Sequence, residues 1–329
     1  MTIRVVCYGL GPIGIGIARL ALARAGVEVV GAIDLDPQKI GRDLGALVGA
    51  ADAGVIVSGD AAATLAEARP EVVLHATSSA LAKVSEQLTQ VARAGAHVVS
   101  TCEELAYPWT AQPQLAAELD AAARRAGVTL LGTGVNPGYA MDALPLMLTA
   151  PCAAVRGVRV LRVVDAARRR GPLQRKVGAG LTPAEFEARV KSGLVRHVGL
   201  PESLHMLATR LGWRLDKMDD SIAAVLADAP ISTEFVEVAA GQVAGVRQVA
   251  RGFLGGREML NLELQMYVGA PDPRDSVEID GDPPVQMTIA GGLHGDVATA
   301  AIVLNAASSV IRAAPGLASM AEVPLVHFW

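Results

Sequence analysis

Three glycines near the start of the chain have the spacing of a phosphate-binding turn. Gly9-Leu10-Gly11-Pro12-Ile13-Gly14 follows the apolar run Ile3–Tyr8 and matches GxGxxG. The first glycine permits a tight bend, the second lets the backbone approach a pyrophosphate, and the third allows close packing of helix on strand. The next helix would offer its free N–H groups to the phosphates, and its first turn needs no amide hydrogen from proline. The residues expected to bind a dinucleotide here are Gly9, Gly11, Pro12, Ile13 and Gly14.

An acid stands where the adenosine ribose of a dinucleotide is normally bound. Asp34 ends the apolar run Val27–Ile33, about twenty residues beyond the glycines. Its carboxylate is the expected acceptor for the ribose hydroxyls, and an acidic turn residue is the alternative. Because a carboxylate repels a 2′-phosphate, the sequence favours NAD over NADP. Lys39 and Arg42 lie near enough on the chain to permit some use of NADP.

Polar residues follow three later predicted strands. Ligands of open parallel sheets bind beyond the carboxyl ends of the strands, so these residues point towards the cofactor. For Thr77, Ser78 and Ser79, capping of the next helix is an equal alternative. For Asn136, which would hold the nicotinamide carboxamide or a water, the alternative is a structural Asn-Pro-Gly turn. The residues are Thr77, Ser78 and Ser79 after Val72–Ala76, Thr101 and Cys102 after His97–Ser100, and Asn136 after Thr129–Leu131.

Two adjacent acids, Glu103 and Glu104, follow the strand His97–Ser100. A carboxylate at this strand end would lie beside the nicotinamide, where hydride transfer occurs. Neighbouring side chains rarely point the same way, so one acid should face the cleft and the other the surface. From location alone, two acids that complement the dipole of a helix N-terminus are an equal alternative.

The first half of the chain predicts a doubly wound α/β domain, a Rossmann fold with a parallel sheet, over residues 1–145. Short β-branched runs alternate there with Ala-rich helical stretches, which is the pattern of right-handed crossovers. The helices are expected at Ile13–Ala25, Lys83–Ala94 and Gln114–Ala126.

The second half predicts an α+β domain for substrate binding and dimerisation over residues 146–292. Its longer, partly alternating runs indicate a mainly antiparallel sheet with one covered face. A helical region, Pro183–Leu211, opens with a capping pattern at Thr182. The last long helix, Asp296–Arg312, is expected to pack back on the first domain, within a segment from about residue 293 to 329. The strands are expected at Val155–Val164, Glu234–Val246 and Leu260–Val268.

Composition excludes several classes of protein. The formal net charge of −4 argues against the basic surface of a nucleic-acid binder. Three widely spaced cysteines and six scattered histidines form no metal-binding pattern, so no metal is expected. No apolar run is long enough to span a bilayer, and no signal peptide is evident. We therefore expect a soluble protein in a reducing, cytoplasmic setting.

Four segments together resemble the native amine dehydrogenases, which belong with 2,4-diaminopentanoate dehydrogenase and share an N-terminal fold with dihydrodipicolinate reductase. The resemblance covers nearly the whole chain, and its middle two segments are more specific than the glycine pattern. The segments are Gly9–Gly14, Ser100–Pro108, Gly132–Gly138 and Gln174–Gly180.

The resemblance implies reversible oxidative deamination: an amine and NAD(P)+ give a ketone or aldehyde, ammonia and NAD(P)H. In the amination direction, hydride passes from nicotinamide C4 to an iminium, and a glutamate manages the amine proton. Carried over to this sequence, that glutamate is Glu103, with Glu104 as the alternative. Residues implied or expected to line the substrate pocket are Val135, Tyr139, Arg162, His197 and Thr299.

Two other functions stay open at this point. One is reduction of a cyclic imine or an amino-acid semialdehyde, as in dihydrodipicolinate reductase. The other is a non-catalytic NAD(H)-binding sensor, which would have no need of an acid pair at the strand end. Few arginines flank the expected pocket, which favours small, neutral, apolar carbonyl compounds as substrates.

Overall fold

The computed structural model describes residues 2–329 and divides into two compact units. One unit runs to Tyr139 and takes in His294–Trp329, and the other is Ala140–Leu293. The following paragraphs describe each unit by itself.

The first unit is built on a seven-stranded sheet in which every neighbouring pair is parallel. The order is β15-β6-β5-β4-β1-β2-β3, so the direction of winding reverses between β1 and β4. This confirms the predicted doubly wound Rossmann fold. The strands are β1 (Ile3–Tyr8), β2 (Val27–Ile33), β3 (Val57–Ser58), β4 (Val72–His75), β5 (His97–Ser100), β6 (Thr129–Gly132) and β15 (Gly316–Ala318).

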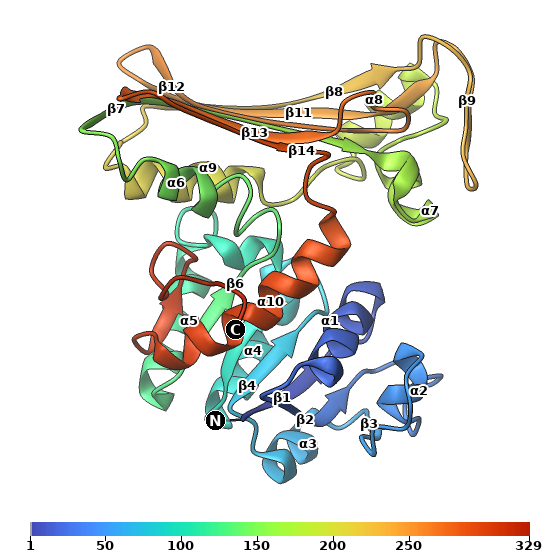
Figure 1. Cartoon of the computed structure of the whole chain (residues 1–329), viewed down its shortest axis with the longest axis vertical. Coiled ribbons are helices and arrows are strands. Elements are labelled where there is room, and N and C mark those ends of the chain that lie inside the picture. Colours follow the sequence, from blue (N-terminus) through green and yellow to red (C-terminus); the bar gives the residue numbers. More distant parts are fainter. Residues whose placement is uncertain (1) are drawn as a thin grey trace. The chain divides into compact units, whose positions relative to one another are not determined.

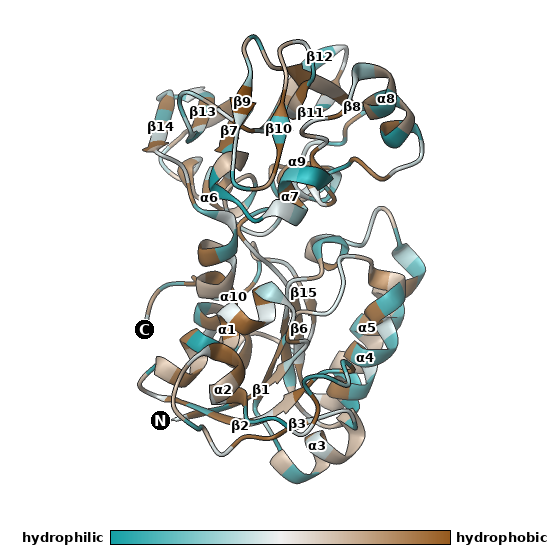
Figure 2. Ribbon diagram, turned by 90° about the vertical axis from the view of Figure 1, so that its right-hand side faces the viewer, coloured by the Kyte–Doolittle hydropathy of each residue, from teal (hydrophilic) through white to brown (hydrophobic). Residues whose placement is uncertain are grey.

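Helices cover both faces of this sheet (Figure 1). One face packs against α1 and α10 through residues such as Ile17 and Val303, and the other against α3, α4 and α5 through residues such as Leu88 and Leu119. The outer sides of α4 and α5 are hydrophilic, as Figure 2 shows. The helices are α1 (Pro12–Ala23), α2 (Leu44–Val48), α3 (Ala61–Ala68), α4 (Leu81–Arg93), α5 (Pro113–Ala126) and α10 (Gly295–Arg312), with the short 3-10 helix η1 at Glu103–Ala106.

The second unit contains a six-stranded mixed sheet in the order β14-β13-β7-β12-β11-β8. The pair β7–β12 is parallel and the other pairs are antiparallel, so the prediction of a mainly antiparallel sheet is confirmed. Helix α9 packs against β11 and β12. The strands are β7 (Ala154–Asp165), β8 (Lys217–Leu226), β11 (Val243–Leu254), β12 (Arg257–Tyr267), β13 (Arg274–Asp282) and β14 (Val285–Ala290), and the remaining elements are β9 (Ile231–Ser232), β10 (Glu237–Val238), α6 (Ala143–Leu148), η2 (Ala166–Arg168), α7 (Gly171–Lys176), α8 (Pro183–Lys191) and α9 (Leu200–Arg210).

Two expected elements of this unit are wrong in extent. The strand predicted over Glu234–Val246 is interrupted at Gly241, whose φ of 81° turns the chain between β10 and β11. The helical region Pro183–Leu211 is two helices, because Gly193 (φ 74°) and Gly199 (φ 105°) break it. Its predicted beginning is confirmed, since Thr182 and Glu185 form a complete capping box.

Among residues 2–329, no helix is both long and apolar enough to cross a lipid bilayer.

Candidate active site

The turn between β1 and α1 is so tight that two of its positions require glycine. Gly9 has a φ of 89°, and a Cβ there would lie 2.5 Å from the carbonyl oxygen of Ala76. A Cβ on Gly14 would lie 1.8 Å from the carbonyl oxygen of Gly9. Gly11 is the N-cap of α1, and a Cβ there would meet no described atom within 4 Å beyond its own chain neighbours and helix. This bare approach to the first amides of α1 fits the pyrophosphate of a dinucleotide.

The next two residues are part of the helix itself. Pro12 is the first residue of α1 and is exposed. Ile13 is half-buried against the hydrophobic core that α1 shares with α10. The side chain of Ile13 therefore packs into the domain, and its backbone faces the turn.

Asp34 ties the end of β2 to the glycine turn. One carboxylate oxygen accepts the amide of Leu10 at 2.6 Å, and the other accepts the amide of Asp36 at 2.8 Å. The ammonium of Lys39 lies 3.3 Å from Asp34 and 3.3 Å from the carboxylate of Asp36. The site thus has an anchored acid at the expected ribose position, with a cation shared between two carboxylates beside it.

The loop after β4 is held by hydrogen bonds to α4 and to the loop after β5. The Thr77 hydroxyl donates to Oε1 of Gln87 on α4 at 2.9 Å, and the Ser78 hydroxyl accepts the amide of Ala80 at 3.3 Å. The carbonyl of Ser79 accepts the Cys102 thiol at 3.2 Å and the Glu104 amide at 3.2 Å. The loops after β4 and β5 are therefore joined at the carboxyl edge of the sheet.

The two adjacent glutamates have different surroundings. Glu104 Oε2 accepts the amide of Leu81, the first residue of α4, at 2.8 Å, and the side-chain amide of Gln112 at 2.6 Å. Glu104 therefore caps α4, and that helix receives no side-chain cap from its N-cap residue Ala80. Glu103, the first residue of η1, is half-buried.

The two residues that precede the acids are held by the sheet. The Thr101 amide donates to the carbonyl of His75 at 2.9 Å, and the Cys102 amide donates to Oγ of Ser100 at 3.1 Å. Burial raises the pKa of the Cys102 thiol to about 12, so this group stays protonated.

The loop after β6 is fixed to α10. The Val135 amide donates to Oγ1 of Thr299 at 3.1 Å, and the Thr133 amide donates to the Ser100 carbonyl at 2.8 Å. Asn136 is buried and precedes a cis proline, Pro137. Three expected residues, Val135, Asn136 and Thr299, are thus brought together, and Tyr139 is half-buried at the end of this unit.

Arg162, in the second unit, is the buried partner of an ion pair. Its Nη1 lies 2.7 Å from Oδ1 of Asp275, and its Nη2 donates to the Leu293 carbonyl at 2.6 Å. The second oxygen of Asp275 accepts the Leu293 amide at 2.7 Å. Each terminal nitrogen of this guanidinium therefore has a partner inside the unit.

His197 borders a small cavity of about 30 Å³ in the same unit. Its backbone amide donates to Oε1 of Gln248 at 3.0 Å. The cavity is lined by aliphatic side chains and by Lys176 and Arg196. Two larger hollows of this unit, about 470 and 390 Å³, lie on the six-stranded sheet. Neither is lined by any of the expected site residues.

Sequence reasoning missed a buried polar cluster below the two acids. His75 ends β4, and its ring nitrogens contact Ser100, Gln87 and Thr77. The signal available in the sequence was a histidine inside the apolar run Val72–Ala76. Its partners come from β5 and α4 and become visible only in the fold.

Comparison with known proteins assigns both parts of the chain. Residues 139–329 match the family model of the 2,4-diaminopentanoate dehydrogenase C-terminal domain. Residues 3–103 match that of the dihydrodipicolinate reductase N-terminus. The resemblance stated from sequence motifs is therefore confirmed.

Individual relatives extend over the full chain. A 2,4-diaminopentanoate dehydrogenase of Acetoanaerobium sticklandii is 29% identical, covering 98% of this chain and 94% of the relative. An amine dehydrogenase of Streptomyces virginiae is 27% identical over 98% of this chain and 96% of its own length. The solved structure of an amine dehydrogenase from Mycobacterium smegmatis is 29% identical, with a TM-score of 0.87 over 100% of this chain and 98% of that one. The chain belongs to the 2,4-diaminopentanoate dehydrogenase family.

Proposed function

We propose that this protein is an NAD(P)-dependent amine dehydrogenase that interconverts small amines with their ketones or aldehydes and ammonia. One observation carries the proposal beyond family membership. Of two adjacent carboxylates at the end of β5, Glu104 is committed to Leu81 and Gln112, so Glu103 is the acid assigned to the chemistry.

The carboxyl edge of the first sheet supplies the groups that would hold the cofactor. We assign the pyrophosphate to the glycine turn and the adenosine ribose to Asp34, with NAD preferred and NADP tolerated through Lys39. NAD, when bound, takes up the hydride from the amine carbon, and NADH returns it in the reverse reaction. The other residues assigned to the cofactor are Thr77, Ser78, Ser79, Thr101, Cys102 and Asn136.

Glu103 would manage the proton of the amine. An alkylammonium ion has no lone pair to drive oxidation at its carbon, so it must first lose a proton. The Glu103 carboxylate can accept that proton, and its negative charge stabilises the cationic C=N group that forms next. In the amination direction the same group returns the proton to the product amine.

The substrate we assign is a small amine without a carboxylate. The pairing of Arg162 with Asp275 and Leu293 supports this, because that guanidinium is already engaged. The aliphatic lining beside His197 is consistent with an apolar substituent. Tyr139, Val135 and Thr299 are the further pocket residues in this proposal.

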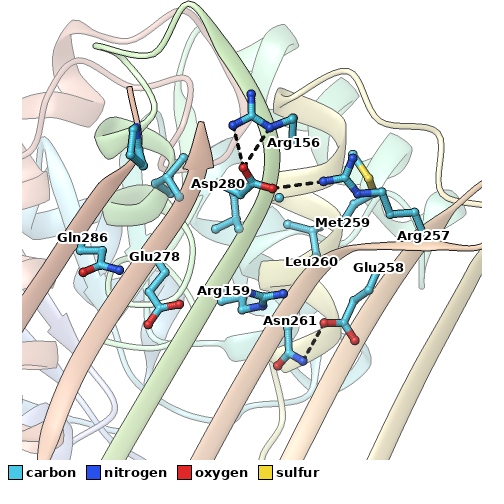
Figure 3. Close-up of a pocket in the computed structure, with 14 residues that line it drawn as sticks. Arg156, Arg159, Arg257, Glu258, Met259, Leu260, Asn261, Glu278, Asp280 and Gln286 are labelled. Carbon is cyan, nitrogen blue, oxygen red and sulfur yellow. Dashed lines mark hydrogen bonds and ion pairs between the residues drawn. The ribbon is translucent and has the colours of Figure 1, made fainter. Parts of the chain in front are cut away.

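We also propose that the protein is a homodimer through the open face of its six-stranded sheet. Figure 3 shows part of this face, where Asp280 bonds Arg156 and Arg257. Arg159 and Glu278 are cross-strand neighbours on β7 and β13. A two-fold contact sets a patch against itself, so a charged patch at such a contact needs both signs of charge, as here. Sedimentation of the wild type is expected to give a dimer, and Arg159→Glu should shift it towards monomer. A monomeric wild type would contradict the proposal.

Three free cysteines, Cys7, Cys102 and Cys152, fit a reducing compartment, and we propose a cytoplasmic location.

The activity is tested by ammonia-dependent oxidation of NADH with a panel of small ketones and aldehydes. Turnover that requires both ammonia and the carbonyl compound is the expected result. Turnover of a cyclic imine without ammonia would instead assign an imine reductase. Binding of NADH without any turnover across the panel would assign a sensor.

A further inference from the structure

One buried titratable group is not used by the proposed chemistry. His75 ends β4 and is completely buried. Its Nδ1 lies 2.8 Å from Oγ of Ser100 on β5. Its Nε2 lies 2.9 Å from Oε1 of Gln87 on α4 and 3.0 Å from the Thr77 hydroxyl. The ring of Tyr8 on β1 packs edge-on against it at 5.3 Å.

The direction of each hydrogen bond follows from the chemistry of the partners. Oε1 of Gln87 can only accept, so Nε2 of His75 carries the hydrogen. Burial lowers the pKa of His75 to about 4, so at neutral pH the ring is uncharged and Nδ1 can only accept. The Ser100 hydroxyl must therefore donate to Nδ1, and its lone pairs are left to accept the Cys102 amide at 3.1 Å.

This chain of bonds ends one residue before the proposed acid. We propose that His75 is a positioning residue: acting through Ser100, it fixes the backbone of Cys102 and so the start of η1, where Glu103 lies. The inference rests on the function proposed above, because it gives Glu103 its role.

The two ring nitrogens divide the network into two arms. The Nδ1 arm leads through Ser100 to the turn that carries Glu103. The Nε2 arm leads to Gln87 and to Thr77, whose methyl group lies 2.8 Å from where a Cβ of Gly9 would stand. The positioning of Glu103 is assigned to the Nδ1 arm alone.

Two substitutions separate these arms. In His75→Asn, the side-chain oxygen replaces Nδ1 and can still accept the Ser100 hydroxyl. In His75→Gln, the side-chain nitrogen replaces Nε2 and can still donate to Gln87, but the bond to Ser100 is lost. We expect His75→Gln to lower kcat for amination by about 10- to 100-fold, because small displacements of a reacting group cost that much. We expect His75→Asn to retain a kcat close to that of the wild type.

A second pair of variants tests the same link without changing the histidine. Ser100→Ala should reproduce the loss in kcat of His75→Gln, and the double variant should be no worse than either one, because both break a single connection. The dissociation constant of NADH, followed by its fluorescence, should change much less than kcat in His75→Gln, Ser100→Ala and the double variant.

His97 provides a matched control. It is the first residue of β5 and so lies at the amino ends of the strands, away from the candidate site. There its Nδ1 accepts the amide of Thr129 at 3.0 Å. His97→Gln should lower the thermal midpoint without lowering kcat. An equal loss of kcat in His75→Asn and His75→Gln, or no loss in either, would overturn the inference while the proposed function stands. A wild type that shows no ammonia-dependent turnover would overturn the proposed function and this inference with it.

Discussion

The carboxylate of Glu104 accepts the backbone amide of Leu81 at 2.8 Å, so the second acid after β5 holds the beginning of the helix that follows β4. A carboxylate is stabilised there by the positive end of the helix dipole as well as by the hydrogen bond. The same carboxylate accepts the amide of Gln112 at 2.6 Å. One of two adjacent acids thus has a structural role, and the proposed function assigns the proton chemistry to its neighbour, Glu103.

The two acids should therefore respond differently to substitution. Glu103→Gln removes the proton acceptor and should lower kcat for deamination by about 10²- to 10⁴-fold. NADH affinity should change little, because Glu103 carries no assigned contact to the dinucleotide. Glu104→Ala should retain most activity and lower the stability by about 1 kcal/mol, the usual cost of a lost helix cap. Steady-state kinetics with thermal denaturation of both variants would check this, and full activity of Glu103→Gln would remove the mechanism.

Cofactor preference should depend on Lys39. Its ammonium lies 3.3 Å from the carboxylates of both Asp34 and Asp36 and offsets charge that would repel a 2′-phosphate. Lys39→Ala should raise the KM for NADPH several-fold and change the KM for NADH much less. Arg125→Ala, which removes the same charge from an exposed site in the last turn of α5, should change neither. A wild-type preference for NADPH would contradict the assignment of NAD.

Local sequence patterns indicated the glycine turn and Asp34 of the candidate site, and they could not indicate the contacts around Glu104 and His75. The glycine turn and Asp34 depend on spacing along one strand–turn–helix unit, which a sequence displays directly. The roles of Glu104 and His75 depend on partners brought together by the parallel pairing of β4 with β5 and by α4. In the same way, β13 is placed in the sheet by its pairing with β7, a distant segment of the chain.

The ion pair of Arg162 and Asp275 should matter for stability. Both side chains are 3% exposed, and Arg162→Met would leave the Asp275 carboxylate buried without its counter-charge. A loss of about 3–5 kcal/mol in the free energy of unfolding is expected, because an uncompensated buried charge is costly. Arg156→Met, which breaks an ion pair with Asp280 whose side chains are 48% and 47% exposed, should cost less than about 1 kcal/mol. Urea denaturation of the two variants compares them directly, and equal losses would refute the prediction.

His75 should also give the protein a measurable sensitivity to acid. Burial lowers the pKa of His75 from 6.5 to about 4 in the folded chain, so below pH 6.5 the unfolded chain binds a proton that the folded chain does not. Stability therefore falls as the pH drops from 6.5 towards 4 and is unaffected by this group above 6.5. The groups that face the ring are Tyr8, Ser100, Gln87 and Thr77, all uncharged in this range. The full effect on the free energy of unfolding is about 3 kcal/mol.

His75→Asn has no proton to bind in this range. Its stability, followed by denaturant melts from pH 7 to pH 4, should therefore decline less steeply than that of the wild type. Parallel curves for the two proteins would show that His75 titrates normally.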